Sequence, residues 1–147
     1  MENNKEHREP HLVYRAGLVP YIVENGQIKM LFMRPTNFEF GTFTYQIGKG
    51  KVENEDATFY DAAIREAKEE LGLFVSNVVK IEEVGNFMGR TMVYTAKVKN
   101  KEMFGQPSDE TESTKWMTLE DFLDEGRDLH RPVILAVHRK ILRMEDL

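Results

Sequence analysis

Cysteine is absent from the 147 residues of the chain. This absence excludes a disulfide framework, a thiolate zinc site and a cysteine nucleophile. The charged start of the chain, MENNKEHREPHL, also lacks the apolar run of a signal peptide. No other stretch approaches the roughly 20 apolar residues that a membrane-spanning helix needs. We therefore expect a cytoplasmic protein without a membrane partner.

Internal repeats and low-complexity tracts are lacking too, and one domain accounts for the length. We expect residues 1–10 to form a mobile polar tail and residues 11–147 to form the domain. The formal charge of −5 argues against a broad surface for nucleic acid. It leaves small anionic substrates open, because a bound metal ion reverses the local field.

The stretch with the clearest pattern runs from Gly50 to Leu73 and reads GKVENEDATFYDAAIREAKEELGL. Within it, Asp56–Leu71 contains no Gly or Pro and is rich in helix formers. We predict a helix there, capped by Asn54 or Asp56 and ended by a left-handed turn at Gly72. The apolar residues recur three and four positions apart and predict a buried stripe of Tyr60, Ala63, Ile64, Ala67, Leu71 and Phe74.

Three carboxylates border that stripe: Glu66, Glu69 and Glu70. We expect Arg65 and Lys68 on the outer face of the helix. Glu66 and Glu70 are like charges at i,i+4, which destabilises an ordinary solvated helix by about 0.2–0.5 kcal/mol. The cluster becomes favourable when a divalent cation neutralises it, and carboxylate oxygens suit Mg²⁺ or Mn²⁺. An acidic helix face without a function is the alternative interpretation.

This stretch resembles the Nudix box. Gly50-Lys51-Val52-Glu53 matches its opening, and Arg65 to Leu73 matches its end. The middle is one residue longer than in the family, and Asp56 stands where the family has Glu, with Glu55 as the alternative. The resemblance extends over the whole chain. It implies a Nudix pyrophosphohydrolase with an α/β fold, the Nudix α/β/α sandwich with a mixed β-sheet between helices.

The remaining sequence reads as strands interleaved with helices. Hairpin-type turns are predicted at Glu24-Asn25-Gly26 and at Met88-Gly89-Arg90, and a loop at Gly48-Lys49-Gly50. Pro132 lies in the first turn of the last helix, where proline is permitted. The predicted strands are Leu12–Val23, Ile28–Met33, Thr42–Ile47, Val78–Phe87, Thr91–Lys99 and Thr114–Met117, and the further helices are Leu119–Asp124 and Arg131–Met144.

The resemblance also implies metal ligands and a cofactor. Glu66 and Glu70 would bind Mg²⁺, or Mn²⁺ as the alternative, together with the backbone carbonyl of Gly50. Glu69 would bind a second ion or its water, and Arg65 would orient a box carboxylate. The expected catalytic group accordingly includes Glu66, Glu69 and Arg65.

Many family members supply a further acid from a loop before a tryptophan strand. Glu110, six residues before Trp116, matches that position, and Glu112 is the alternative. Its role would be metal ligation or general base catalysis. Family members differ in which Glu is the base, so that assignment stays open.

Upstream of the box, Tyr45 to Gly50 reads YQIGKG. This resembles the aromatic-Gln-x-Pro-Lys-Gly segment of dinucleoside polyphosphate hydrolases, with Gly48 in place of proline. A cation at Lys49 can hold an additional phosphate. Tyr94 lies near the position of a base-stacking tyrosine in that group, and Arg34 ends a strand near the site as a candidate phosphate ligand. Core packing of Tyr94 and a surface position of Arg34 are the alternatives.

The function implied is Mg²⁺-dependent hydrolysis of a diphosphate bond in nucleoside diphosphate derivatives, above all in dinucleoside polyphosphates such as diadenosine tetraphosphate. Hydrolysis of ADP-ribose or nucleotide sugars is one alternative, and removal of diphosphate from RNA 5′ ends is another that the net acidity weakens. A sensor that binds a nucleotide without cleaving it is the alternative from a different class. Such proteins usually lose box carboxylates, whereas this chain keeps all three. The expected partner is a small nucleotide, and the oligomeric state stays open.

Overall fold

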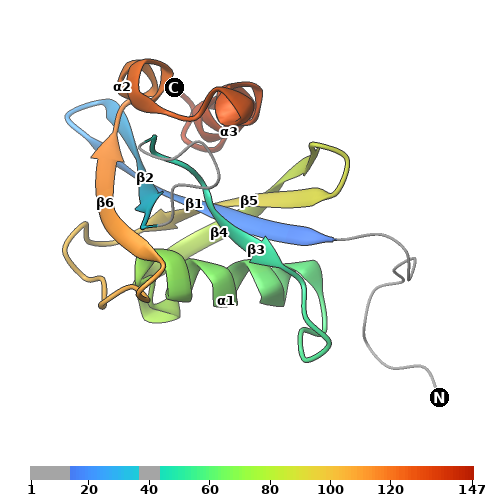
Figure 1. Ribbon diagram of the computed structural model, residues 1–147. Helices are drawn as coiled ribbons and strands as arrows, with labels where there is room; N and C mark the ends of the chain where they lie inside the picture. Colours follow the sequence, from blue (N-terminus) through green and yellow to red (C-terminus); the bar gives the residue numbers. More distant parts are fainter. Residues whose placement is uncertain (1–13, 37–43) are drawn as a thin grey trace.

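The computed structural model describes residues 14–36 and 44–147. The predicted tail at residues 1–10 and the first two residues of the predicted strands Leu12–Val23 and Thr42–Ile47 lie outside these ranges. Within them, a mixed six-stranded sheet lies between helix α1 on one face and helices α2 and α3 on the other (Figure 1). This arrangement confirms the predicted α/β/α sandwich.

The central strand of the sheet is β1. It pairs antiparallel with β2 and β3 and parallel with β5, while β4 pairs with β5 and β6 with β2. The strands are β1 (Arg15–Glu24), β2 (Gln27–Pro35), β3 (Gly48–Lys51), β4 (Val78–Phe87), β5 (Thr91–Val98) and β6 (Thr111–Met117). Both predicted hairpin turns are confirmed, with left-handed backbone at Asn25 and Gly26 in one and at Met88 and Gly89 in the other.

One predicted loop is a strand. Gly48-Lys49-Gly50 belongs to β3, because the start of β1 supplies it with backbone partners from Leu18↔Gly48 to Arg15↔Lys51. The predicted strand Thr42–Ile47 is wrong over its described part. Gln46 and Tyr45 form isolated bridges there, to Met33 and Gly126.

The helices are α1 (Phe59–Leu71), α2 (Leu119–Glu125) and α3 (Arg131–Met144). Thr58 caps α1 by accepting a hydrogen bond from the Asp61 backbone N–H, so the predicted caps Asn54 and Asp56 are wrong. The predicted left-handed end at Gly72 is confirmed. No helix within residues 14–36 and 44–147 is long and apolar enough to cross a membrane.

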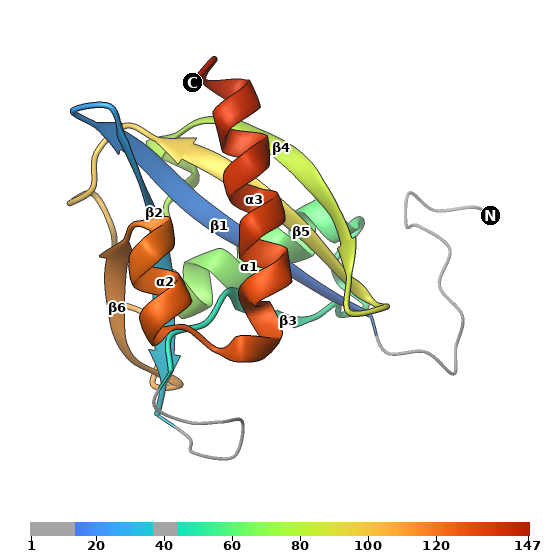
Figure 2. The same ribbon diagram turned by 90° about the horizontal axis from the view of Figure 1, so that it is seen from above.

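Each face of the sheet carries its own part of the core. Alternate residues of a strand point to opposite faces, so Leu18 packs toward α1 and Val19 toward α3. On α1 the buried residues are Ala62, Ala63, Glu66, Ala67 and Leu71. The predicted apolar stripe is therefore wrong at its two ends, because Tyr60 and Phe74 are exposed. Figure 2, viewed from the α3 side, shows α3 crossing the strands that it covers.

Candidate active site

Strand β3 has the sequence Gly-Lys-Gly-Lys, and its two faces differ. A Cβ atom at Gly50 would lie 2.4 Å from the carboxyl group of Glu66, and one at Gly48 would lie 3.0 Å from the Leu71 side chain. Helix α1 therefore packs directly on the glycine face of the strand. Lys49 and Lys51 alternate with the glycines and face the other side.

Arg65 fastens the loop before α1 to the helix. Its guanidinium donates to both carboxyl oxygens of Asp56, at 3.1 and 2.9 Å, to Glu66 at 2.9 Å and to the Lys51 carbonyl at 3.0 Å. The hydrogen bond to Asp56 is the main reason why the pKa of Arg65 is raised. The outer-face position predicted for Arg65 is wrong, because Asp56 and Glu66 draw it against the loop. Its contact with Glu66 agrees with an orienting role, which stays a prediction.

Glu66 and Glu70 are the two box carboxylates closest to β3. Glu66 is buried below Gly50, and burial raises its pKa although Arg65 opposes the shift. Glu70 lines a cleft of about 770 Å³ beside β3. Burial, followed by the charges of Glu66 and Glu110, raises the pKa of Glu70 to about 7. The predicted ligands Gly50, Glu66, Glu70 and Glu110 are thus brought together.

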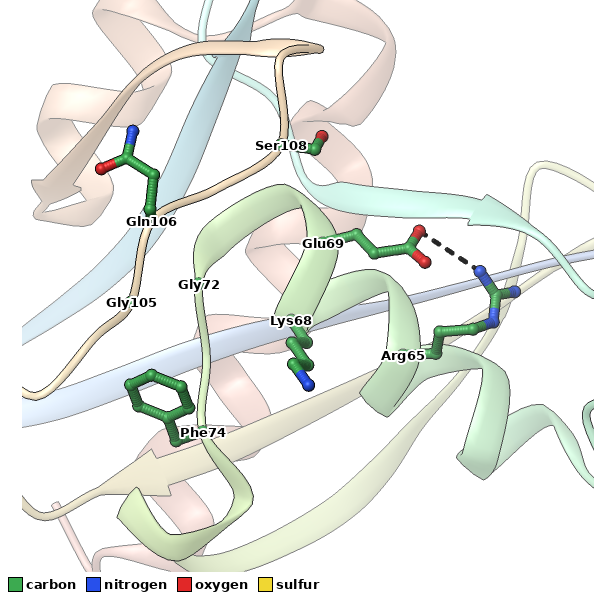
Figure 3. A pocket seen from close by; sticks show the side chains of 8 residues that line it. All are labelled: Arg65, Lys68, Glu69, Gly72, Phe74, Gly105, Gln106 and Ser108. Carbon is green, nitrogen blue, oxygen red and sulfur yellow. Dashed lines mark hydrogen bonds and ion pairs between the residues drawn. The ribbon is translucent and has the colours of Figure 1, made fainter.

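Glu69 points elsewhere. It lines a separate pocket of about 440 Å³ and reaches the guanidinium of Arg65 at 3.4 Å (Figure 3). The same pocket holds Phe74 and Ser108, whereas Glu70 lines the cleft beside β3. The charge of Glu69 still contributes to raising the pKa of both Glu66 and Glu70, so Glu69 lies within electrostatic reach of the other box carboxylates, and its role toward a second ion stays a prediction.

The loop before β6 is tied to the end of α1 and brings Glu110 into the cleft. Its backbone and side chains reach three carbonyls of the helix end: Gly105 N–H donates to Gly72, Ser108 N–H to Glu69 and the Thr111 hydroxyl to Glu70, at 2.7 to 2.8 Å. Glu110 lines the cleft together with Glu70. The alternative acid, Glu112, instead accepts a 2.6 Å hydrogen bond from Arg34.

Two predicted substrate-binding residues do not reach the cleft. Arg34 binds Glu112 and lies over the Tyr45 ring, whereas its neighbours Met33 and Pro35 line the cleft. Tyr94 is only 8% exposed and packs edge-on against Tyr60 in the core below α1. Both assignments are corrected by the alternation of strand residues, which turns each side chain away from the cleft.

The cleft is rich in cations that the sequence did not single out. Only Lys49 was predicted. Arg15 and Lys51 are paired neighbours on β1 and β3, Arg90 is the last residue of the β4–β5 turn, and Arg127 follows α2. Only the fold brings these positions together, so no sequence motif could have found Arg127. Within the described part of the chain, none of these five cations forms an ion pair with a carboxylate.

Burial lowers the pKa of Lys49, and the charges of Arg15 and Arg127 lower it further. Gly17 on β1 makes room for the lysine, because a Cβ there would lie 2.7 Å from the Cβ of Lys49. Lys49 is thus held close to two further cations. An anionic group that enters the cleft would relieve their repulsion.

His130 supports the segment that leads into β3. It is fully buried, and its Nδ1 accepts a hydrogen bond from the Ile47 backbone N–H at 3.3 Å. Burial, followed by the charges of Lys49 and Arg127, lowers the pKa of His130 to about 3. The ring is therefore neutral and acts as an acceptor.

The oxygen atoms of the site fit a divalent cation. No three acidic or histidine side chains of the described residues already converge on one point. Arg65 forms ion pairs with both Glu66 and Glu69. Nevertheless the Glu66 carboxylate touches the Gly50 backbone, and Glu70 is close enough to Glu66 for its pKa to respond. Carboxylate and backbone carbonyl oxygens are the donors that hard divalent cations take.

Comparisons with known proteins agree with this geometry. The NUDIX domain profile matches residues 14–137. No curated protein matches the chain in sequence. An Ap4A hydrolase of C. elegans, solved as a binary complex, has a TM-score of 0.70 at 23% identity and covers 88% of this chain and 98% of its own. The NUDIX domain of Shewanella oneidensis NrtR, complexed with ADP ribose, has a TM-score of 0.72 at 17% identity, with 91% and 94% covered.

At such identities the solved structures show a shared fold. The family assignment is based on the domain profile, which spans most of the sequence. The matched residues include the glycine-containing strand β3 and the carboxylate-bearing helix α1. The chain belongs to the Nudix domain family and is a Nudix pyrophosphohydrolase.

Proposed function

We propose that this protein hydrolyses a diphosphate bond of dinucleoside polyphosphates, such as diadenosine tetraphosphate, with Mg²⁺ as its cofactor. The observation that carries the proposal is the charge of the cleft. Five cations line it beside two carboxylates, Glu70 and Glu110, in a chain whose net charge is −5. A long phosphate chain matches this local excess of positive charge.

In the proposed reaction, water adds to one phosphorus and the bond from that phosphorus to the bridging oxygen breaks. Diadenosine tetraphosphate would give ATP and AMP. Mg²⁺ would offset phosphate charge and activate the water. Glu66, Glu70 and the Gly50 carbonyl would hold the ion, and Lys49 and its neighbouring arginines would bind the remaining phosphates. Glu110 would either bind the ion or accept the proton of the water.

ADP-ribose is the second candidate substrate. It is favoured by the similarity to the NrtR domain, which was solved with ADP ribose. A diphosphate carries fewer charges than a tetraphosphate and would leave part of the cationic lining without a phosphate partner.

A substrate panel with Mg²⁺ tests the proposal, with products separated by anion-exchange chromatography. We expect ATP and AMP from diadenosine tetraphosphate as the dominant reaction. Lys49→Ala should lower kcat/KM for the tetraphosphate about tenfold more than for ADP-ribose, because a charge-assisted hydrogen bond to the extra phosphate is lost. Lys68→Ala, exposed on α1 outside the cleft, is the control. Equal losses on both substrates would contradict the polyphosphate assignment.

A further inference from the structure

Two exposed apolar side chains line the otherwise charged cleft. Met88 is 39% exposed and comes from the β4–β5 turn, and Leu129 is 53% exposed and precedes α3 in a short 3-10 helix, Asp128–His130. The β4–β5 turn and the start of α3 lie on the same side of the sheet (Figure 1). Isolated exposed apolar residues are ordinary, but these two share one concave site with the phosphate-binding candidates.

The backbone at Met88 makes methionine an unexpected residue there. Its φ is 54°, in the left-handed region, and Gly89 follows at 79°. Asn or Gly fits such a turn position with less strain. A long apolar side chain at this position therefore indicates a use for the side chain itself.

Each of these apolar residues is two positions away from a cation of the same cleft. Arg90 follows Met88, and Arg127 precedes Leu129. A nucleotide joins an anionic phosphate chain to a flat, largely apolar base. Ligand sites of this kind combine apolar walls with a few placed polar groups. The β4–β5 turn and the segment before α3 each provide one apolar side chain and one cation.

The described aromatic rings do not offer an alternative place for the base. Tyr94 is buried on the α1 side. The ring of Tyr45 contacts Arg34 and Lys115, whose cationic groups lie 5.3 and 5.7 Å from its centroid. Neither ring lines the cleft, in which the exposed large apolar side chains are Met88 and Leu129.

We propose that Met88 and Leu129 form the nucleoside subsite of this cleft, where a base of the substrate packs against them while Arg90 and Arg127 bind the adjoining phosphates. The inference rests on the proposed function, since it takes the ligand to be a nucleotide. Met88 and Leu129 are specificity-determining residues that hold the base and take no part in the bond cleavage. The flexible thioether of Met88 adapts to a planar ligand.

The test uses the double variant Met88→Asn, Leu129→Gln in the full chain. Asn suits the left-handed backbone at residue 88, and Leu129 is exposed, so the fold should remain stable. Leu135→Gln is the matched control, because Leu135 is 41% exposed on α3 and is not among the cleft-lining residues.

Binding of ADP and of inorganic tripolyphosphate is measured by isothermal titration calorimetry in the presence of EDTA, where no metal-dependent turnover occurs. We expect the Kd of ADP to rise about tenfold in the double variant, the order of magnitude that apolar pocket contacts contribute. The Kd of tripolyphosphate should stay unchanged, and Leu135→Gln should equal the wild type for both ligands.

An unchanged Kd for ADP in the double variant would overturn the subsite, as would a wild type that does not bind ADP. An equal rise for ADP and tripolyphosphate would overturn it too, because it would indicate a distorted cleft. Failure of the proposed function looks different. In that case the wild type hydrolyses no dinucleoside polyphosphate with Mg²⁺. The Kd of ADP for the wild type and for the double variant still shows whether Met88 and Leu129 bind a nucleotide base.

Discussion

At the scale of single residues, His130 couples the stability of the site to pH. Its Nδ1 needs a lone pair to accept the hydrogen bond from Ile47, so the hydrogen bond requires that nitrogen to be unprotonated. Its Nε2 is buried and has no hydrogen-bond partner among the described residues. Burial and two nearby cations lower its pKa to about 3. The hydrogen bond that holds Ile47, just before β3, therefore requires the His130 ring to be neutral.

His130→Asn tests this coupling, because Asn keeps an acceptor but cannot be protonated near neutral pH. A histidine with a lowered folded pKa stabilises the fold above its unfolded pKa of about 6.5, and this contribution is lost as the pH falls toward the folded value. From about pH 7.5 to about pH 5, the wild type should lose about 2 kcal/mol more unfolding free energy than the variant. Urea unfolding at both pH values measures this. A difference that does not change with pH would contradict the neutral-ring account.

Sequence spacing brought some site residues together as predicted and failed for Tyr94. Gly50, Glu66 and Glu70 come together as the motif implied, because strand and helix periodicity are local properties. Glu69 is next to Glu70 in sequence and points about 100° away around the helix, where it meets Arg65, while its charge still raises the pKa of Glu66 and of Glu70. Tyr94 failed because a tyrosine in a strand can face either layer, and only the pairing of β5 with β1 decides which.

At the scale of elements, the contact between β3 and α1 builds the site. The glycine face of β3 lets the helix approach until the Glu66 carboxyl lies against the Gly50 backbone. The lysine face of the same short strand meets the cleft. One short element therefore brings candidate metal ligands and candidate phosphate ligands to the same cleft, with Gly50 and Glu70 lining it beside Lys49.

A pair of alanine substitutions on that face should separate packing from chemistry. In Gly50→Ala the new Cβ would meet the Glu66 carboxyl at 2.4 Å, and in Gly48→Ala it would meet Leu71 side-chain carbons at 3.0 Å. Both should lower the unfolding free energy by about 1–3 kcal/mol, as overpacking does. Only Gly50→Ala should also lower kcat by about a hundredfold, because it displaces a metal-ligand candidate. Thermal unfolding and steady-state kinetics with Mg²⁺ measure the two effects. Equal kcat values in both variants would contradict the role of Gly50.

Element boundaries were predictable where sequence signals were strong. The bounds of β4 and α3 match their predictions, since a turn or a proline marks an end of each. Strand β3 was missed because glycine and lysine are poor strand formers, and its register comes from β1. The start of α1 was misplaced because Asp56 accepts hydrogen bonds from Arg65 and Glu53, which leaves Thr58 as the cap.

At the scale of the whole molecule, like charges gather at the site although the chain could have dispersed them. Lys49 lies near Arg15 and Arg127, and Glu70 lies near Glu66 and Glu110. Both groupings are unfavourable in the empty protein. Functional sites commonly hold such locally unfavourable arrangements, and their removal commonly stabilises a protein while function is lost.

The raised pKa of Glu70 makes the cost of this charge repulsion measurable as a pH-dependent stability. Its folded pKa is about 7, above its ordinary value of 4.5. A carboxyl with a raised folded pKa stabilises the fold below its unfolded pKa, and that contribution is lost as the pH rises through the folded pKa. At about pH 8 the metal-free protein thus carries a charge in the cleft that the unfolded chain would hydrate better.

Glu70→Gln should therefore stabilise the empty protein and disable the loaded one. Without metal, Tm should rise by about 3 °C at about pH 8 and change little at about pH 5. Saturating Mg²⁺ should raise the Tm of the wild type but hardly that of the variant, because ligand binding stabilises only the protein that binds it. Turnover of the variant should fall by about two orders of magnitude. Differential scanning calorimetry and the product assay measure both effects. If Mg²⁺ shifts the Tm of both proteins equally, Glu70 does not hold the ion, and the stability gain alone would then reflect only removal of a buried charge.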